Sequence, residues 1–244
     1  MMDYFWNSKE NIPEGLGFKL FGGTHLCWLL AALITFVICC VLYRFLSEKH
    51  RRFFLRFVAV LMVVMEILKN IILLITSEWY PDHLPLHLCG INIFVCLWHS
   101  IKPNSLNREL LYALGMPGAM AALLFSNWTM LPCMNFFHIH SFVVHILLVM
   151  YPLVLLFSHE LWPDVKQLPK CLLFLLAAGI PLFFLNKALD TNFMFLNRAD
   201  TGNPLSLFEA WLGRPCYIIG YIPLISVVWF LMYLPWSMAK KKQL

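Results

Sequence analysis

The sequence predicts an all-α fold, a polytopic membrane helical bundle of about seven transmembrane helices. Three observations predict it. The chain has 244 residues, of which 61% are hydrophobic and only 13% charged, whereas soluble domains carry about 25% charged residues. Its mean hydropathy is +0.73. Apolar stretches near the length that crosses a bilayer, roughly 20 residues, recur along the whole chain. A soluble fold of this length could not bury so much apolar surface.

Seven apolar stretches follow one another, at about 21–43, 53–77, 84–100, 109–126, 136–158, 168–187 and 216–236. The third and fourth are short. The fourth contains Gly115, Pro117 and Gly118, which predict a kink or a broken helix there. Because no internal repeat or long linker divides the chain, we expect one membrane domain over residues 1–244. The charged residues among the first 20 positions do not fit a cleavable signal peptide.

The lysines and arginines predict the orientation. They concentrate in the expected first loop at 44–56, after the third stretch at 102–108, before the sixth at 166–170, and at 240–242. Short loops rich in these residues stay in the cytoplasm, so we expect the N-terminus outside and the C-terminus inside. The net charge of +5 reflects this bias and gives a weak attraction to anionic lipids. It does not indicate nucleic acid.

In this orientation, polar residues from five stretches lie in the outer half of the membrane. They are His25 in the first; Glu66, Lys69 and Asn70 in the second; His87 and Cys89 in the third; His138, His140 and His145 in the fifth; and Asn186 and Asp190 at the end of the sixth. Ionisable groups inside a membrane are costly and by default suggest function. Their common depth therefore predicts a polar pocket that opens toward the outer leaflet or the outer water.

Each of these residues also has a structural interpretation. Glu66 and Lys69 are three apart on a helix and can neutralise each other, so an ion pair and a catalytic Glu66 both stay open. His145 is either a hydrogen-bonded core residue or a catalytic base. Interfacial histidines are readily solvated, which is the alternative for His25, His83, His138 and His140. Cys89 lies at a predicted helix start, where a thiolate is favoured, and is the best nucleophile candidate.

A thiol and an imidazole beside lipid indicate a membrane acyltransferase or transacylase that acts on phospholipid or lysophospholipid. In such an enzyme the cysteine attacks an ester carbonyl, a histidine takes the thiol proton, and a thioester holds the acyl group. Two alternatives stay open. One is a lipid or small-molecule transporter or binding protein, since the interrupted fourth stretch fits a discontinuous helix. The other is a metal-dependent lipid hydrolase, which is weakly indicated because no HExxH pattern occurs. We expect no metal and no cofactor.

Several stretches resemble one known family along nearly the whole chain. They are FGGTHL (21–26), LPLHLCGINIF (84–94), ELLYALGMPGAMAALLF (109–125), TNFMFLNR (191–198), NPLSLFEAWLGRP (203–215) and a histidine seven residues before Pro152. They resemble the bacterial YwaF-like integral membrane proteins, which are related to the animal transmembrane protein 164 acyltransferases. The resemblance implies acyl transfer on phospholipids through a cysteine, with Cys89 and His145 as the catalytic pair and Asn192 in the supporting pocket. It also implies a bacterial plasma membrane. Where the family often has TNYMYL, this chain has TNFMFL and lacks two hydroxyl groups.

The orientation can be tested directly. We expect a reporter fused to the C-terminus to be cytoplasmic and the loop at 127–135 to be external, because seven spans place them on opposite sides. Labelling of introduced cysteines with a membrane-impermeant reagent measures both. Finding the two positions on the same side of the membrane would contradict the seven-span arrangement.

Overall fold

The structure, a computed structural model, describes residues 4–199 and 204–241, and the regular elements of this part are all helical. Six segments are long and apolar enough to cross a membrane. They comprise α1 (Gly23–Phe45), α2 (Glu48–Ile75), η2 with α3 (Pro81–His83 and Leu88–Ile101), α6 (Phe136–Phe157), η4 with α7 (Val165–Gln167 and Leu168–Leu189), and η6 with α9 (Cys216–Gly220 and Tyr221–Lys241). The predicted all-α membrane fold is confirmed.

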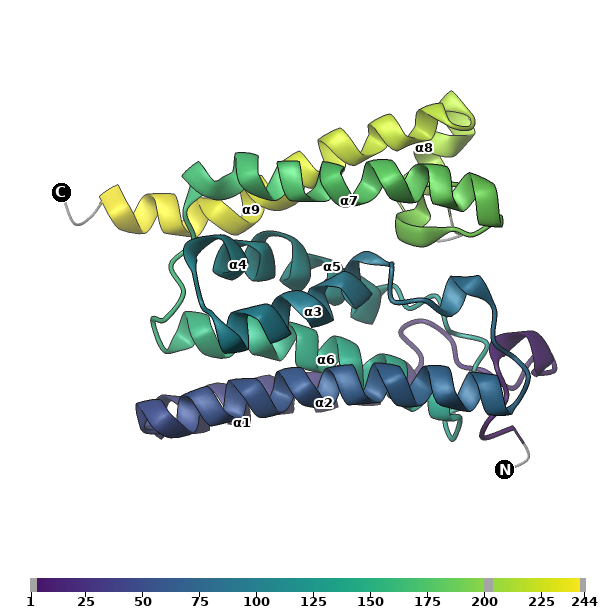
Figure 1. The fold of residues 1–244 in the computed structure, drawn as a ribbon, viewed down its shortest axis with the longest axis horizontal. Helices are drawn as coiled ribbons and strands as arrows, with labels where there is room; N and C mark the ends of the chain where they lie inside the picture. Colours follow the sequence, from purple (N-terminus) through teal and green to yellow (C-terminus); the bar gives the residue numbers. More distant parts are fainter. Residues whose placement is uncertain (1–3, 200–203, 242–244) are drawn as a thin grey trace.

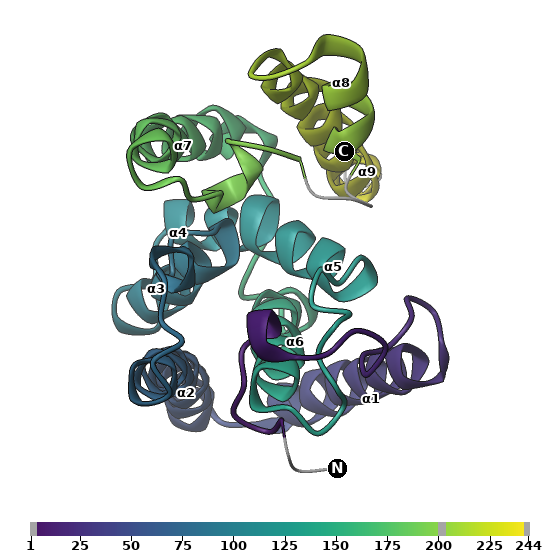
Figure 2. The same cartoon turned by 90° about the vertical axis from the view of Figure 1, so that its right-hand side faces the viewer.

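The fourth apolar stretch is built differently from these six. It consists of α4 (Ser105–Leu110), the π-helical turn η3 (Leu111–Gly115) and α5 (Met116–Leu124). These elements lie between the layer of α7 and α9 and the layer of α3 and α6 (Figures 1 and 2). Leu110, Leu111 and Ala113 are at most 1% exposed. Irregular helical backbone is tolerated at membrane depth where protein surrounds it. The total of seven spans and the orientation stay predictions.

Two boundaries differ from the sequence prediction. The expected loop at 44–56 is only two residues long, because α1 ends at Phe45 and α2 begins at Glu48. Hydropathy marks only the apolar part of a helix, and α2 begins with the polar residues EKHRR. The helix α8 (Leu205–Leu212) was not predicted as an element. Of the expected C-terminal basic cluster, Lys242 lies outside the described residues.

The helix α6 is the centre of the bundle. It packs against α1, α2, α3 and α5, and Figure 2 shows α1, α2 and α5 arranged around it. In lipid, apolar side chains gain little by leaving one apolar environment for another, so close packing and hydrogen bonds hold helices together. Phe142 and Tyr151, both fully buried on α6, provide such packing.

The helix α9 is held to η3 by polar groups of aromatic side chains. Tyr112 Oη donates to the Met232 carbonyl at 2.7 Å, and Trp229 Nε1 donates to the Ala113 carbonyl at 2.9 Å. Tyr233 Oη donates to the buried carboxylate of Glu109. Buried tyrosine and tryptophan side chains usually place their polar atoms in this way. These bonds connect the last span to the interrupted fourth stretch.

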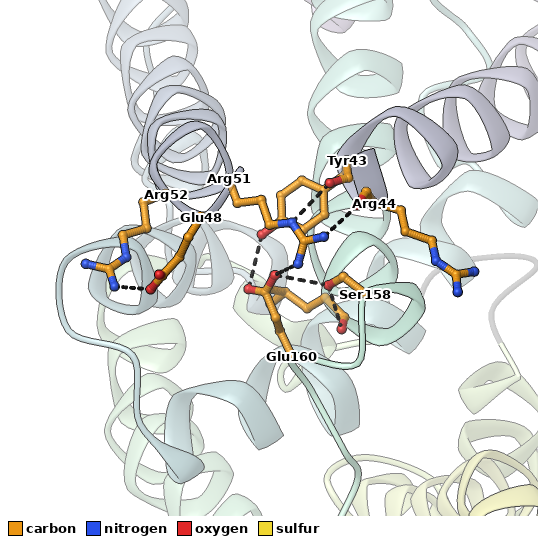
Figure 3. Close-up of polar contacts among 8 residues, drawn as sticks. Tyr43, Arg44, Glu48, Arg51, Arg52, Ser158 and Glu160 are labelled. Carbon is orange, nitrogen blue, oxygen red and sulfur yellow. Dashed lines mark hydrogen bonds and ion pairs between the residues drawn. The ribbon is translucent and has the colours of Figure 1, made fainter. Parts of the chain in front are cut away.

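A polar cluster around Arg51 closes the end of the bundle opposite the N-terminus (Figure 3). Arg51 Nη1 donates to Glu160 Oε1 at 3.0 Å, while Nε and Nη2 donate to the carbonyls of Tyr43 at 3.2 Å and Arg44 at 2.7 Å. Tyr43 Oη also donates to Glu160 Oε2, at 3.2 Å. Carbonyls in the last turn of a helix have no partner within the helix. Arg51 therefore caps α1 and connects the α1–α2 turn to the end of α6.

Two neighbouring arginines in Figure 3 provide a matched test of this connection. We expect Arg51→Ala to lower the free energy of unfolding by on the order of 2 kcal/mol, because it removes charge-assisted hydrogen bonds and unpairs a carboxylate. Arg52 pairs with Glu48 across the helix surface, and both side chains are more than three-quarters exposed. Such pairs contribute little, so Arg52→Ala should change stability by less than about 0.5 kcal/mol. Thermal unfolding of the purified variants in detergent measures both, and equal shifts would contradict the assignment.

Candidate functional site

The polar residues expected in the outer half of the membrane form three clusters toward one end of the bundle. The N-terminal ends of α1, α3 and α6 and the C-terminal ends of α2 and α7 meet at this end, on the right of Figure 1. We name the clusters by their helices. The α2–α6 cluster contains Glu66, Lys69, Asn70, His140 and His145; the α3–α7 cluster contains His87, Asn186 and Asn192; the α1–α6 cluster contains His25 and His138.

Glu66 and Lys69 organise the α2–α6 cluster. The Lys69 ammonium donates to Glu66 Oε1 and, at 3.1 Å, to the carbonyl of His83 just before α3. Asn70 Nδ2 donates to Glu66 Oε1 at 3.3 Å, and Asn70 Oδ1 accepts from Trp79 Nε1 at 3.0 Å. The side chains of Glu66 and Lys69 are only 9% and 17% exposed. The ion pair considered from the sequence is present, and it also ties α2 to the segment that leads into α3.

The two histidines of this cluster have unused hydrogen-bonding capacity. His145 Nδ1 lies 2.6 Å from the Ser141 carbonyl. A carbonyl can only accept, so Nδ1 carries the proton and Nε2 keeps its lone pair. His140 Nε2 is buried and lies 4.0 Å from Glu66 Oε2 without a hydrogen bond. The positive charge of Lys69 interacts electrostatically with the imidazoles of His140 and His145. Both rings are therefore placed to receive a polar ligand.

Trp128, from the loop between α5 and α6, completes the surroundings of His145. Its ring stacks on that imidazole with centroids 5.1 Å apart and an interplanar angle of 19°. Its Nε1 is buried and has no hydrogen-bond partner among residues 4–199 and 204–241. Buried polar atoms almost always have partners, and each exception needs an explanation. Nothing in the sequence around Trp128 marked it, because only the fold brings this loop onto α6.

Cys89 is the second residue of α3. The preceding His87 is the N-cap residue but makes no side-chain capping bond. The backbone N–H groups of Leu88, Cys89 and Gly90 donate no hydrogen bond within the part of the chain that the structure describes. Free N–H groups at a helix start, together with the helix dipole, stabilise negative charge. The half-buried thiol of Cys89 lies in this first turn, beside the free N–H groups.

Cys89 is the second residue of α3 and His145 is the tenth of the 22 residues of α6, and these two helices pack on each other. No hydrogen bond joins Sγ to the imidazole in the described residues. Catalytic pairs often tighten only in the complex with substrate, so this separation is compatible with a shared role.

The α3–α7 cluster fixes a loop against the start of α3. His87 Nδ1 accepts from the backbone N–H of Met194 at 3.3 Å, and its ring contacts Phe193 and Phe195 with centroids 5.5 and 5.7 Å away. Met194 and Phe195 have φ angles of 53° and 54°. Non-glycine residues rarely adopt this left-handed region, so the loop needs tertiary support.

Two asparagines supply this support. Asn186, fully buried on α7, accepts from the Phe193 N–H at 2.8 Å and the Thr191 hydroxyl at 2.9 Å, and donates to the Phe193 carbonyl at 3.0 Å. Asn192 accepts from the N–H groups of Asn197 and Arg198 at 3.2 and 3.0 Å. The TNFMFLNR stretch thus forms a folded loop that packs on His87, two residues before Cys89.

Two predicted pocket residues make no hydrogen bond to Cys89 or His145 among the described residues. His25 accepts from the Phe21 N–H at 2.9 Å and donates to the Leu123 carbonyl at 2.7 Å, so both nitrogens are used in a fully buried position. Asp190 is exposed at the end of α7 with φ 51°. The solvated alternative does not describe His25, His138 and His140, which are at most 6% exposed. Among residues 4–199 and 204–241, no three His, Cys, Asp or Glu side chains could hold a metal ion.

Long apolar helices with polar side chains gathered at one end define this chain as a polytopic integral membrane protein. More specifically, it belongs to the TMEM164 family, whose sequence profile matches residues 20–233. This confirms the expected relation to the transmembrane protein 164 proteins and is compatible with the YwaF-like resemblance. No curated protein and no solved structure matches the chain significantly.

The asparagine support of the loop can be tested with two neighbouring residues of α7 and its end. We expect Asn186→Ala to destabilise the protein by at least about 2 kcal/mol, because it leaves the buried N–H of Phe193 and the hydroxyl of Thr191 without their acceptor. Asp190→Asn is the control, since asparagine tolerates the same left-handed backbone and the Asp190 side chain makes no hydrogen bond in the described residues. Thermal unfolding in detergent should shift only for Asn186→Ala.

Proposed function

We propose that this protein is a membrane-embedded acyltransferase or transacylase that moves an acyl chain of a phospholipid or lysophospholipid through a thioester on Cys89. One observation carries the proposal. His140 Nε2 and Trp128 Nε1 are buried without a hydrogen-bond partner among the described residues, and His145 Nε2 keeps its lone pair beside them. Family membership supports a membrane setting. In that setting the phospholipids of the bilayer are available as substrates.

In the first half-reaction, Cys89 Sγ attacks the carbonyl carbon of a phospholipid ester. The thiol proton passes to His145 Nε2, whose lone pair is preserved because Nδ1 donates to the Ser141 carbonyl. The tetrahedral intermediate collapses when the C–O bond breaks, and the leaving glycerol oxygen takes the proton from His145 Nε2. The products are a lysophospholipid and an acyl thioester on Cys89.

In the second half-reaction, an acceptor hydroxyl gives its proton to His145 Nε2 as its oxygen attacks the thioester carbonyl. The C–S bond breaks, and the Cys89 thiolate takes that proton back. A lysophospholipid hydroxyl as acceptor gives transacylation, whereas water gives hydrolysis.

The negative oxygen of each tetrahedral intermediate needs hydrogen-bond donors. The free N–H groups at the start of α3, those of Leu88, Cys89 and Gly90, are such donors. Trp128 Nε1 is a further donor beside His145. Donors that already point at the site contribute most to catalysis, because nothing has to reorganise when charge develops. Glu66, Lys69 and Asn70 contribute indirectly, by fixing α2 and the segment before α3.

The chemistry can be tested with Cys89→Ser and His145→Ala in the full-length protein in lipid nanodiscs. We expect Cys89→Ser to abolish acyl-enzyme formation, because an alcohol is far harder to ionise than a thiol with a pKa near 8.5. His145→Ala should react at least about 100-fold more slowly, the usual contribution of a general base, and should partly recover as the pH rises toward the thiol pKa. The double variant should be no worse than Cys89→Ser, since residues that act as a unit are lost together. The measurement is the transfer of a radiolabelled acyl chain from phospholipid to protein and to product.

Cys27→Ser is the matched control, because Cys27 is an exposed thiol on α1 outside the clusters. It should retain full acylation. Full activity of Cys89→Ser would contradict the thioester mechanism and favour either binding and transport of lipid or a different hydrolytic centre.

A further inference from the structure

We propose that a groove between α2 and α3 receives the acyl chain of an outer-leaflet phospholipid and delivers its ester to Cys89. The inference rests on the proposed function, because it names how the substrate of that site arrives. It also predicts lipid binding that can be measured without any reaction.

The groove has a volume of about 330 Å³, which is within the range of roughly 300–1,000 Å³ typical of ligand sites. Its apolar wall is formed by Ile67, Ile71 and Leu74 of α2 and by Phe94 of α3. From Val63 to Leu74, the lining residues at its two ends on α2, the helix rises roughly 16 Å at 1.5 Å per residue. This is about half of a hydrocarbon core roughly 30 Å thick. The groove is therefore as long as one leaflet is deep.

Its surroundings determine the occupant. Ile67, Ile71 and Phe94 are 54%, 45% and 46% exposed and lie on two helices that are long and apolar enough to span a membrane. At that depth the molecules around the protein are lipids, so the apolar wall faces acyl chains. A chain parallel to α2 would place its methyl end near Val63 and its ester near the outer end of the groove.

The groove also reaches the candidate site. Glu66 and Asn70 line it and belong to the α2–α6 cluster, which includes His140 and His145. At its outer end the groove is lined by Pro85, four residues before Cys89. Pro85 packs directly against Gly90, the residue that follows Cys89. A Cβ atom added to Gly90 would lie 2.6 Å from the Pro85 carbonyl carbon. Only a glycine at position 90 allows this approach, which brings the groove wall onto the first turn of α3.

Two tryptophan substitutions on α2 test the groove. Ile71→Trp fills it, whereas Leu68→Trp adds the same bulk at a position that is equally exposed, at 44%, but is not part of the lining. With a long-chain phospholipid as donor, we expect Ile71→Trp to acylate Cys89 at least about tenfold more slowly, equivalent to about 1.4 kcal/mol, and Leu68→Trp to behave as wild type. With a short, water-soluble acetyl ester, both variants should acylate Cys89 at the wild-type rate. An equal loss with both donors, or no loss at all, would overturn the proposal.

A second measurement separates the groove from the chemistry. A phospholipid with a photoactivatable acyl chain, added to Cys89→Ser in nanodiscs, should crosslink to the lining residues of α2 and α3. Ile71→Trp in that background should reduce this crosslinking, and Leu68→Trp should not. Crosslinks spread evenly over the membrane-facing helices would overturn the groove even if Cys89 forms a thioester. Crosslinks confined to the groove without any acylation of Cys89 would refute the proposed function and leave the lipid site standing.

Discussion

Polar groups at membrane depth must find partners inside the protein, because hydrocarbon offers none. Most of the polar side chains in the three clusters satisfy this constraint through specific hydrogen bonds and ion pairs. His25 uses both ring nitrogens between Phe21 and Leu123, and Asn186 uses its whole amide on the 191–193 segment. The pairing of Glu66 with Lys69 removes two isolated charges at once. Buried polar atoms that have no hydrogen-bond partner are therefore exceptions.

Two of the buried polar atoms without a partner in the described part of the chain belong to residues beside His145. His140 Nε2 and Trp128 Nε1 lack partners among the described residues, and His145 Nε2 keeps its lone pair. A group kept unpaired in a buried place costs stability, about 1–3 kcal/mol, and a ligand that supplied the missing partner would offset this cost. At the opposite end, Arg51 satisfies its neighbours with charge-assisted bonds (Figure 3). Buried polar atoms without a partner among the described residues also occur away from His145, on His99, Arg108 and Gln167.

The start of α3 connects the three parts of the proposed mechanism. Its free N–H groups are donors for a developing negative charge. His87 accepts a hydrogen bond from the loop that Asn186 and Asn192 stabilise. Gly90 packs against Pro85, which lines the groove. Cys89 lies on a helix that packs against α6. The reactivity proposed for Cys89 depends on this position and not on any local sequence feature alone.

The sequence by itself determined the all-α membrane class, the approximate limits of six long helices, the interruption in the fourth stretch and the relation to the family. Hydropathy and glycine or proline content are local properties that set these features wherever the chain folds in lipid. Only the tertiary structure separated His25 from His145, brought Trp128 onto the imidazole and joined Glu66 and Asn70 to a lipid-facing groove. The physical reason is that depth in the membrane can be counted along a helix, whereas the lateral position of a side chain depends on which helices pack together.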